Sequence, residues 1–434
     1  MNSYLRLLDA GLWGNGLRWP QRLSENFSFL RGNLLILTLS WILWFPAMRM
    51  IDPYGQLYIT DLGATTIILG VINALSTVVL AFIRVPGGYV ADRFGRRKII
   101  ITMTLGVALA YLFYALAPSW EWILAGAVIS NTCLMYQPAL MAMRADSVPP
   151  GKRGTGFALA DFLSGVACIP APMIAIYLVS TRGRVEGMRI VYLVAVGFGI
   201  GATVLRMFLK ETLPKREKNP KTENLKELRE DFKREYSDAV KLIFKKLPNL
   251  AVLYMIDEFA IVGCTIIFQL FAVDFLGLSN EEWGLVYMMS AIVYLITLMP
   301  IGIMGDKVGR RKTTLFLLVL IAFSGFLSVT APPRAGYTMI VLFAAFSMFF
   351  LANTLYSSIL PALEADLVPR AKRGRVAAAL MLLSSLAGAA GQAFAGFAYE
   401  RINPRFPLFI LIALMTTCFF IVAFFIKEPK EREL

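Results

Sequence analysis

The chain has 434 residues, of which 57% are hydrophobic and 17% charged, and its mean hydropathy is +0.64. This composition excludes an ordinary soluble globular protein and predicts an integral membrane protein. The chain contains no His, which excludes imidazole bases and His metal ligands, and its four Cys lie in separate apolar runs, so neither a disulfide framework nor a zinc site is indicated. The net charge of +14 is compatible with nucleic-acid binding, an anionic membrane surface, or the basic loops of a membrane protein.

Apolar runs long enough to cross a bilayer recur from residue 33 to the end of the chain. Twelve transmembrane helices are predicted, at residues 33–59, 65–91, 99–118, 120–145, 155–180, 190–209, 250–275, 283–305, 313–331, 337–363, 376–399 and 406–426. They divide the chain into an N-terminal arm (1–32), a six-helix bundle (33–209), a linker (210–249), a second six-helix bundle (250–426) and a tail (427–434). The predicted fold class is an all-α integral membrane protein made of two pseudo-symmetric six-helix bundles.

The linker, residues 210–249, is rich in Lys and Arg and also contains regularly spaced apolar residues. Its apolar residues recur at helical spacing, namely Leu225, Leu228, Phe232, Tyr236, Ala239 and Ile243. This spacing indicates an amphipathic helix that lies along the cytoplasmic face of the membrane. A solvated, charged linker is the alternative.

The basic residues are distributed unequally between the two sides of the predicted bundle. Most of the 43 Lys and Arg lie in the termini and in the loops after even-numbered spans. Basic loops mark the cytoplasmic side, so both termini are predicted to be cytoplasmic in a multi-pass protein of the plasma membrane. Because the basic residues follow this pattern, they are expected to lie beside the lipid bilayer, and nucleic-acid binding is not expected.

Four segments of the first half of the chain recur in the second, in the same order, and one of them is GQLYITD at 55–61, which returns as FQLFAVD at 268–274. GGYVADRFGRRK at 87–98 returns as IGIMGDKVGRRK at 301–312, and ADSVPPGKRG at 145–154 returns as ADLVPRAKRG at 365–374. Because six is an even number, two copies of a six-span unit have the same orientation in the membrane, and a cavity is expected between them.

The repeated loop, which holds Gly, Asp, Gly and Arg at fixed spacing between the second and third spans of each half, resembles the signature loop of the major facilitator superfamily of secondary transporters. The resemblance covers nearly the whole chain. It implies a non-enzymatic, alternating-access transporter of a small molecule, without cofactor or metal. It also implies a cytoplasmic gate formed by Gly88, Asp92, Arg93, Gly95, Arg96, Arg97, Asp146, Arg153, Gly302, Asp306, Gly309, Arg310, Arg311, Glu364, Asp366 and Arg373. Loops that serve merely as basic membrane anchors are the alternative.

Ionisable and amide side chains inside the spans are costly in lipid, so each is a candidate for the substrate or proton site. One face of the first span and one face of the seventh carry such residues at helical spacing: Arg49, Asp52 and Gln56, then Glu258, Thr265 and Gln269. Since the repeat relates Gln56 to Gln269, both faces are expected to border the central cavity. A bridge between Arg49 and Asp52 that neutralises both charges is the alternative.

Four further polar residues inside the spans are candidates: Asn131, Asp161, Asp257 and Asn353. Asp257 points about 100° away from the adjacent Glu258 and is expected to pack against a neighbouring helix through a hydrogen bond. Asp161 has the apolar Met381 as its repeat mate, an asymmetry expected of a substrate or proton site, but a structural pair with Arg144 is an equal alternative. Each asparagine could bond the substrate or a neighbouring helix.

The fifth span contains GVACIPAP at 165–172. This segment is faintly similar to the Gly-Pro motif that antiporters of the superfamily carry in this span. However, Ile169 stands where a glycine would precede the proline, so export by antiport stays open. Pro170 and Pro172 are expected to kink the helix.

These features together predict a secondary transporter that is driven by a proton gradient. Without His, a carboxylate has to carry the proton, and the candidates are Asp52, Asp161 and Glu258. The predicted cytoplasmic segments contain no GxxxxGKS/T loop, which argues against an ATP-driven pump.

The substrate and the direction of transport have two interpretations. Few charges in the spans, together with many Phe and Met, favour export of amphipathic, drug-like compounds. Uptake of a sugar or organic anion, with Arg49 as the partner of the anion, is the alternative. From other classes, a membrane enzyme is disfavoured because no acid, base or metal cluster is visible, and a non-transporting receptor stays open.

Overall fold

The structure, a computed structural model, describes residues 30–148, 153–213, 241, 243–245, 247–355, 359–368 and 373–426. Most of the N-terminal arm, most of the linker and the tail lie outside the described residues. The amphipathic helix predicted for the linker lies mainly among them, so it stays a prediction.

The first half of the chain forms a helical bundle in which several predicted spans are built from two shorter helices. Its elements are α3 (Gly32–Ile51), α4 (Gly55–Asp61), α5 (Thr66–Phe94), α6 (Arg96–Ala115), α7 (Trp120–Cys133), the 3-10 turn η1 (Leu134–Tyr136), α8 (Gln137–Asp146), α9 (Arg153–Cys168), α10 (Ala171–Arg182) and α11 (Arg184–Met207).

The second half repeats this arrangement, but the counterparts of the divided first and fifth spans, α13 (Pro248–Leu270) and α18 (Arg373–Arg401), are single long helices. Its other elements are the π-helical turn η3 (Phe271–Phe275), α14 (Asn280–Val308), α15 (Arg310–Thr330), α16 (Thr338–Thr354), α17 (Leu360–Leu367) and α19 (Phe406–Phe425).

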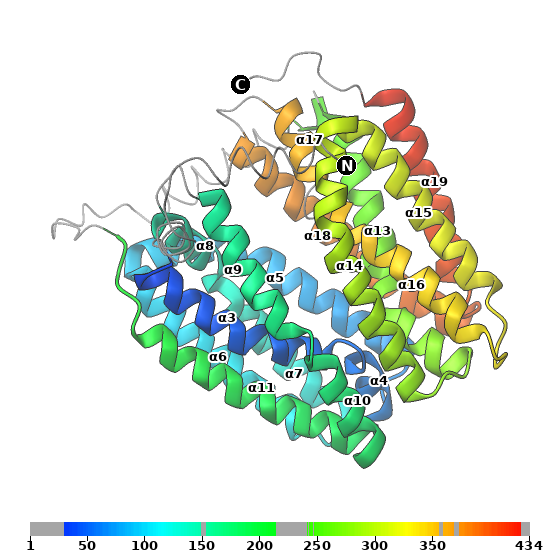
Figure 1. The fold of residues 1–434 in the computed structure, drawn as a ribbon, viewed down its shortest axis with the longest axis horizontal. Coiled ribbons are helices and arrows are strands. Elements are labelled where there is room, and N and C mark those ends of the chain that lie inside the picture. Colours follow the sequence, from blue (N-terminus) through cyan, green and yellow to red (C-terminus); the bar gives the residue numbers. More distant parts are fainter. Residues whose placement is uncertain are drawn as a thin grey trace, which may run out of the picture.

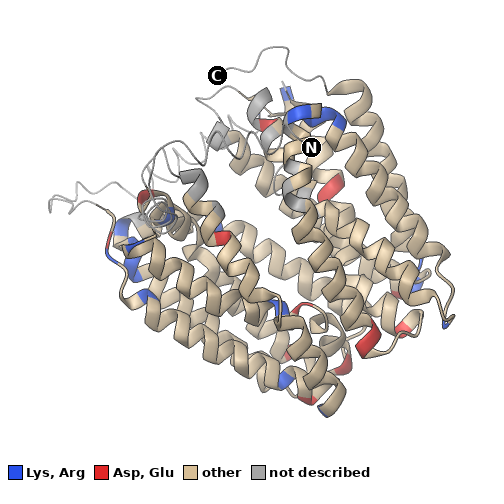
Figure 2. Ribbon diagram, viewed as in Figure 1, with Lys and Arg blue, Asp and Glu red and all other residues tan. Residues whose placement is uncertain are grey.

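Within the described residues, ten helical segments are long and apolar enough to cross a membrane. α14 and α16 stand at the positions of the predicted eighth and tenth spans. Charged residues gather at the two ends of the bundles and leave the middle of most helices uncharged (Figure 2). The predicted fold class, an all-α membrane protein of two helical bundles, is confirmed (Figure 1).

Proline interrupts two of the predicted spans. The first, predicted as one helix over 33–59, ends at Ile51 and restarts at Gly55, with Pro53 in the turn between α3 and α4. The fifth divides into α9 and α10 at Pro170, where a kink is predicted. Because proline has no N–H to donate and its ring crowds the preceding turn, each interruption leaves backbone groups without helical partners.

A glycine at the same position of the repeat precedes the third long helix of each half. Gly95, between α5 and α6, has a φ of 96°, and Gly309, between α14 and α15, has a φ of 108°. A side chain is strained in this region of φ, so the turn itself explains the second glycine of the repeated loop in each copy, Gly95 and Gly309.

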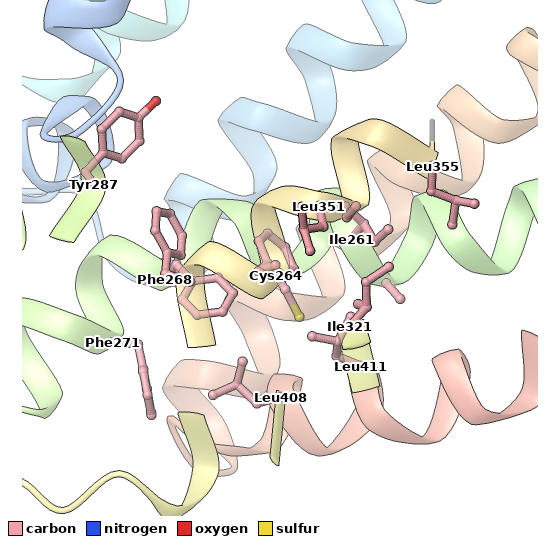
Figure 3. Close-up of a cluster of buried hydrophobic side chains, with 14 of the residues drawn as sticks. Ile261, Cys264, Phe268, Phe271, Tyr287, Ile321, Leu351, Leu355, Leu408 and Leu411 are labelled. Atoms are coloured by element: carbon pink, nitrogen blue, oxygen red, sulfur yellow. The ribbon is translucent and has the colours of Figure 1, made fainter. Parts of the chain in front are cut away.

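Aromatic side chains pack the interior of the second half (Figure 3). The rings of Phe268 on α13 and Phe349 on α16 have centroids 4.6 Å apart, and those of Trp283 on α14 and Phe346 on α16 are 5.0 Å apart. Pairs at these distances stabilise a core beyond the area they bury. They hold α13, α14 and α16 together as one unit.

The two halves meet where α5 crosses α18 and where α10 packs on α14. A Cβ added to Gly70 of α5 would stand 2.6 Å from the carbonyl oxygen of Gln392 and 3.2 Å from Cα of Gly396 on α18. Small residues allow such close approach of transmembrane helices. The bundles converge at the end that carries α4, here called the closed end, and diverge toward the end where α3 begins and α19 ends (Figure 1).

Candidate functional site

A cavity of about 810 Å³ lies between the two halves. α3, α9 and α10 line it from the first half, and α14 and α16 line it from the second. Among the described residues that line it, the charged ones come from the first half: Arg49, Asp52 and Asp161. The second half contributes Tyr287, Met288, Ala291, Ile292, Tyr294, Leu295 and Phe350. One wall is thus suited to a polar group and the other to an apolar body.

Arg49 and Asp52 form an ion pair, with Nη1 2.8 Å from Oδ2. The hydroxyl of Tyr287, on α14 of the other half, donates to the same Oδ2 at 3.0 Å. The two charged side chains are still 50% and 36% exposed, so the bridge does not withdraw them from the cavity. Asp52 therefore connects the charged wall of the cavity to the second half.

Asp161 on α9 pairs with Arg144 on α8, with Oδ1 2.7 Å from Nη2. Arg144 also donates to the carbonyl oxygen of Phe157, and its guanidinium lies 4.8 Å and 4.3 Å from the ring centroids of Trp41 and Phe157. These contacts leave the Arg144 side chain 10% exposed and that of Asp161 59% exposed. The pair therefore presents a carboxylate, backed by a buried cation, to the cavity.

Gln269 fills the interruption of the first span at the closed end. Its Nε2 donates to the carbonyl oxygen of Asp52 at 2.6 Å, and its Oε1 accepts from the backbone N–H of Gln56 at 3.0 Å. In a continuous helix the N–H of residue 56 would bond the carbonyl of residue 52. A side chain of the second half thus takes the place of one helical hydrogen bond in the first.

Two aromatic residues complete the seal at this interruption. The indole Nε1 of the fully buried Trp283 donates to the carbonyl oxygen of Pro53 at 2.7 Å. In the opposite direction, the hydroxyl of Tyr54 donates to the carbonyl oxygen of Asn280 at 2.6 Å. Both acceptors are backbone carbonyls: that of Pro53 lies in the interruption between α3 and α4, and that of Asn280 lies in the first turn of α14.

An arginine adds a charged contact between the halves at the closed end. Arg184 makes a two-pronged bond to Asp61, with Nε and Nη2 2.7 Å and 2.6 Å from the two carboxylate oxygens. Its Nη1 lies 3.7 Å from Oδ1 of Asp274 in the second half. Paired hydrogen bonds of this kind fix geometry as well as charge.

Among the described side chains, the remaining candidates inside the spans are not part of the lining of this cavity. Thr265 donates to Ile261 of its own helix at 2.8 Å, and Asn131 donates to Ala127 of its own helix at 2.8 Å. The expectation that both polar faces border the cavity is therefore not met in full. The break at Pro53 changes the direction in which Gln56 points relative to the two charged residues before it.

Asp257 and Glu258, on α13, differ strongly in their surroundings. Asp257 is fully buried and, within the described part of the chain, neither of its carboxyl oxygens has a hydrogen-bond partner, which corrects the expectation of a bond to a neighbouring helix. Glu258 packs against α18, where its Cγ lies 2.8 Å from the position of a Cβ added to Gly388. The side chain of Asn353 lies outside the described ones.

The repeated loops make their described contacts within their own halves. Arg96 pairs with Asp146, with Nη1 2.6 Å from Oδ2. Arg97 donates to the carbonyl oxygen of Met207 at the end of α11, and its repeat mate Arg311 donates to Val422 near the end of α19. A lock between the two halves built from these loops therefore stays a prediction.

The other gate candidates are placed as follows. Tyr254 donates to Glu364 at 2.9 Å, Gly88 and Arg93 belong to the last turns of α5, and Arg310 begins α15. The remaining side chains lie outside the described ones: Asp92, Arg153, Gly302, Asp306, Asp366 and Arg373.

Replacing Arg97 or Arg311 with glutamine is expected to destabilise the half to which it belongs. Each arginine supplies donors and positive charge to the end of the last helix of its bundle, where carbonyls lack helical partners. The expected loss in the free energy of unfolding is about 1–2 kcal/mol. Thermal unfolding in detergent measures it, with the exposed Lys98→Gln as the matched control. An equal loss in that control would contradict the role of the arginines.

Three residues of the closed end were not candidates from the sequence: Trp283, Tyr287 and Arg184. In the sequence, Trp283 is the first residue of the predicted span 283–305, a position that is typical of a membrane-interface aromatic. Nothing in the linear spacing relates it to Pro53, because 230 residues separate the two. The available signal was Pro53 itself. A proline that interrupts a span leaves backbone carbonyls without helical partners, and side-chain donors that could bond them can be sought in other spans.

Comparison with known proteins agrees with the fold and the repeat. The sequence profile of the Major Facilitator Superfamily matches residues 33–275 and 250–434. The chain is 28% identical over 170 residues to a "Na(+), Li(+), K(+)/H(+) antiporter" of Planococcus maritimus, a match that covers 38% of this chain and 39% of that protein. It is 24% identical to the "Multidrug resistance protein MdtH" of Photorhabdus laumondii subsp. laumondii, over 89% of this chain and 92% of that protein.

A solved structure shares the fold. The nucleoside transporter NupG superposes with a TM-score of 0.68 over 91% of this chain and 98% of its own, at 13% sequence identity. At that identity the likeness concerns the arrangement of the helices.

Proposed function

The chain belongs to the Major Facilitator Superfamily, and we propose that it is a proton-coupled secondary transporter that exports amphipathic, drug-like compounds by alternating access. The observation that carries this proposal is the cavity between the halves, with charges on one wall and apolar side chains on the other. An amphipathic molecule could direct its charged group to α3 and α9 and its apolar body to α14 and α16.

The charge that best fits the cavity is positive. Asp161 offers its carboxylate from a side chain that is 59% exposed, whereas its partner Arg144 is held behind it. Aromatic residues such as Tyr294 and Phe350 line the opposite wall, where flat apolar bodies and cations can both be accommodated. Arg49, at 50% exposure, keeps uptake of an anion as the second candidate.

One further observation supports export, and another supports the placement of the diverging end of the bundles in the cytoplasm. The chain is similar to proteins named as a cation/H+ antiporter and as a multidrug resistance protein. The basic repeated loops lie at the end where the bundles diverge, so the positive-inside rule makes that the cytoplasmic end. The cavity would then receive its substrate from the cytoplasm.

Flux into proteoliposomes tests the proposal. Purified protein is reconstituted, a pH gradient is imposed in either direction, and uptake of ethidium, a fluorescent anion and a neutral sugar is followed in parallel. Accumulation of ethidium against its gradient, abolished by a protonophore, is the expected result. Anion or sugar uptake alone would favour the second candidate, and binding without flux would favour a receptor.

Asp161→Asn is expected to weaken transport of ethidium. Removal of one charge near a bound cation lowers the attraction by about 1–2 kcal/mol in a partly hydrated cavity, which corresponds to roughly tenfold in apparent affinity. Transport of a neutral amphipathic compound should change little. Glu186→Gln, which removes an exposed carboxylate away from the cavity lining, is the matched control. A tenfold loss for the neutral compound would point to a structural role of Asp161 instead.

A further inference from the structure

Asp257 is a fully buried carboxyl group, at 0% exposure, in the middle of a transmembrane helix. In the described part of the chain neither carboxyl oxygen has a hydrogen-bond partner. An ionised carboxylate in such a place would lose its hydration without any compensating contact, which is among the most costly arrangements in a protein. The neutral, protonated form avoids this cost.

The other acidic residues inside the spans are placed differently. Asp52 bonds Arg49 and Tyr287, and Asp161 bonds Arg144, so each has a cation at hydrogen-bond distance that stabilises its charge. Glu258 is partly exposed and also interacts with its surroundings. Of these four acids, Asp257 is the one whose surroundings in this conformation favour a bound proton.

The titratable groups that lie close enough to act electrostatically on Asp257 come from α13 itself and from α19. Its own helix contributes Glu258 and Tyr254, whose hydroxyl is engaged by Glu364, and α19 contributes the thiol of Cys418. None of these described groups is a cation that would stabilise the carboxylate.

We propose that Asp257 is the proton-binding site of this transporter, which holds a proton in the present conformation and releases it to water when the two halves rearrange. This inference rests on the proposed proton coupling. In the release step the O–H bond of the carboxyl group breaks, the proton passes to water, and the carboxylate remains. Uptake from the opposite side reverses the step.

The contact between the halves offers a route by which rearrangement can reach Asp257. Glu258 lies against α18 at Gly388, and its charge acts on Arg84 of α5 in the first half. α5 and α18 form the crossing between the halves. When the halves move about this crossing, the distance from Arg84 to α13 changes. A closer cation favours the carboxylate form and so promotes release.

Asp257→Asn in proteoliposomes tests this site. The amide keeps the shape and the neutral state of the group but cannot carry a proton. Ethidium accumulation driven by a pH gradient should fall by about tenfold or more, whereas exchange of ethidium across the membrane without a gradient should stay within about twofold of wild type. The pH dependence of ethidium binding should flatten. Glu186→Gln should change neither measurement.

Three outcomes would overturn the proposal. The first is gradient-driven accumulation retained by Asp257→Asn, the second is the same result for Asp257→Leu, and the third is a pH dependence of ethidium binding that Asp257→Asn leaves unchanged. Failure of wild-type protein to accumulate ethidium under any pH gradient would instead count against the proposed function itself.

A measurement on the wild-type protein keeps the test decisive if the variants fail to fold. Dicyclohexylcarbodiimide reacts with protonated carboxyl groups in apolar surroundings, and mass spectrometry locates the product. Modification at Asp257 near neutral pH, reduced in alkaline buffer, is expected. Modification at Asp52 or Asp161, with Asp257 unmodified, would contradict the assignment whatever the transport assay gives.

Discussion

Replacing Trp283 with alanine is expected to open the closed end and admit a membrane-impermeant thiol reagent to Cys168, which lines the cavity. Trp283 is fully buried, and removal of a buried Trp side chain costs about 3–5 kcal/mol. The hydrogen bond to Pro53 joins the two halves, so it contributes in the sealed conformation. A loss of about 1.4 kcal/mol that affects the sealed conformation alone raises the ratio of molecules with an open end to molecules with a sealed end by about tenfold.

The measurement is the rate at which a maleimide added on the side of the closed end labels Cys168, and it should rise by about fivefold or more. Trp283→Phe keeps the ring on Phe346 but lacks the indole N–H, so an intermediate rate is expected. Cys168→Ser in the same background measures labelling at the other free cysteines. An unchanged rate in folded Trp283→Ala protein would show that the seal does not depend on this contact.

Replacing Gly391 with leucine is expected to prevent normal packing of the second half. A Cβ at this position of α18 would stand 2.8 Å from the backbone carbonyl carbon and 2.9 Å from Cα of Phe259 on α13. Gly263 of α13 meets the same stretch of α18, with an added Cβ 2.8 Å from the carbonyl oxygen of Gly391. The neighbours are backbone atoms that cannot rotate away, so the cost should reach or exceed the upper end of the usual range of about 1–3 kcal/mol for an overpacked site.

Thermal unfolding in detergent is the measurement, and the apparent melting temperature should fall by more than about 5 °C with loss of transport. Gly197 on α11 supplies the control, because nothing lies within 4 Å of a Cβ added there. Gly197→Leu should leave both stability and transport near wild type. Equal melting temperatures for the two leucine variants would refute the close approach of α13 and α18.

The sequence was sufficient for the fold because each level of its pattern agreed with the others. Apolar runs predicted the spans, and the repeated loop predicted two halves of the same orientation. Gly95 and Gly309 occupy equivalent turns with positive φ, which is why the repeat keeps a glycine there. The family resemblance drawn from that loop is confirmed by the profile match over both halves.

The candidate site was less predictable, because helical spacing assumes a continuous helix. Arg49 and Asp52 lie before the break in the first span and line the cavity, but Gln56 lies after it and joins the closed end. Spacing also cannot identify partners from distant parts of the chain. The bond from Tyr287 to Asp52 depends on how the two halves pack, and the unpartnered state of Asp257 depends on the packing around α13.

The hydrogen bonds of Gln269 and Trp283 to the interrupted first span depend on side chains in one half and on the main chain in the other, so the two halves differ in how easily a substitution breaks these bonds. On one side the partners are the carbonyls of Asp52 and Pro53 and the N–H of Gln56, atoms of the main chain. A change of side chain at these positions leaves those acceptors and that donor in place, provided that the chain keeps its course. On the other side a single substitution removes the donor. At this contact, variants that lose the bonds should therefore arise at Gln269 and Trp283 of the second half, whereas the reverse bond from Tyr54 to Asn280 is lost by a substitution in the first half.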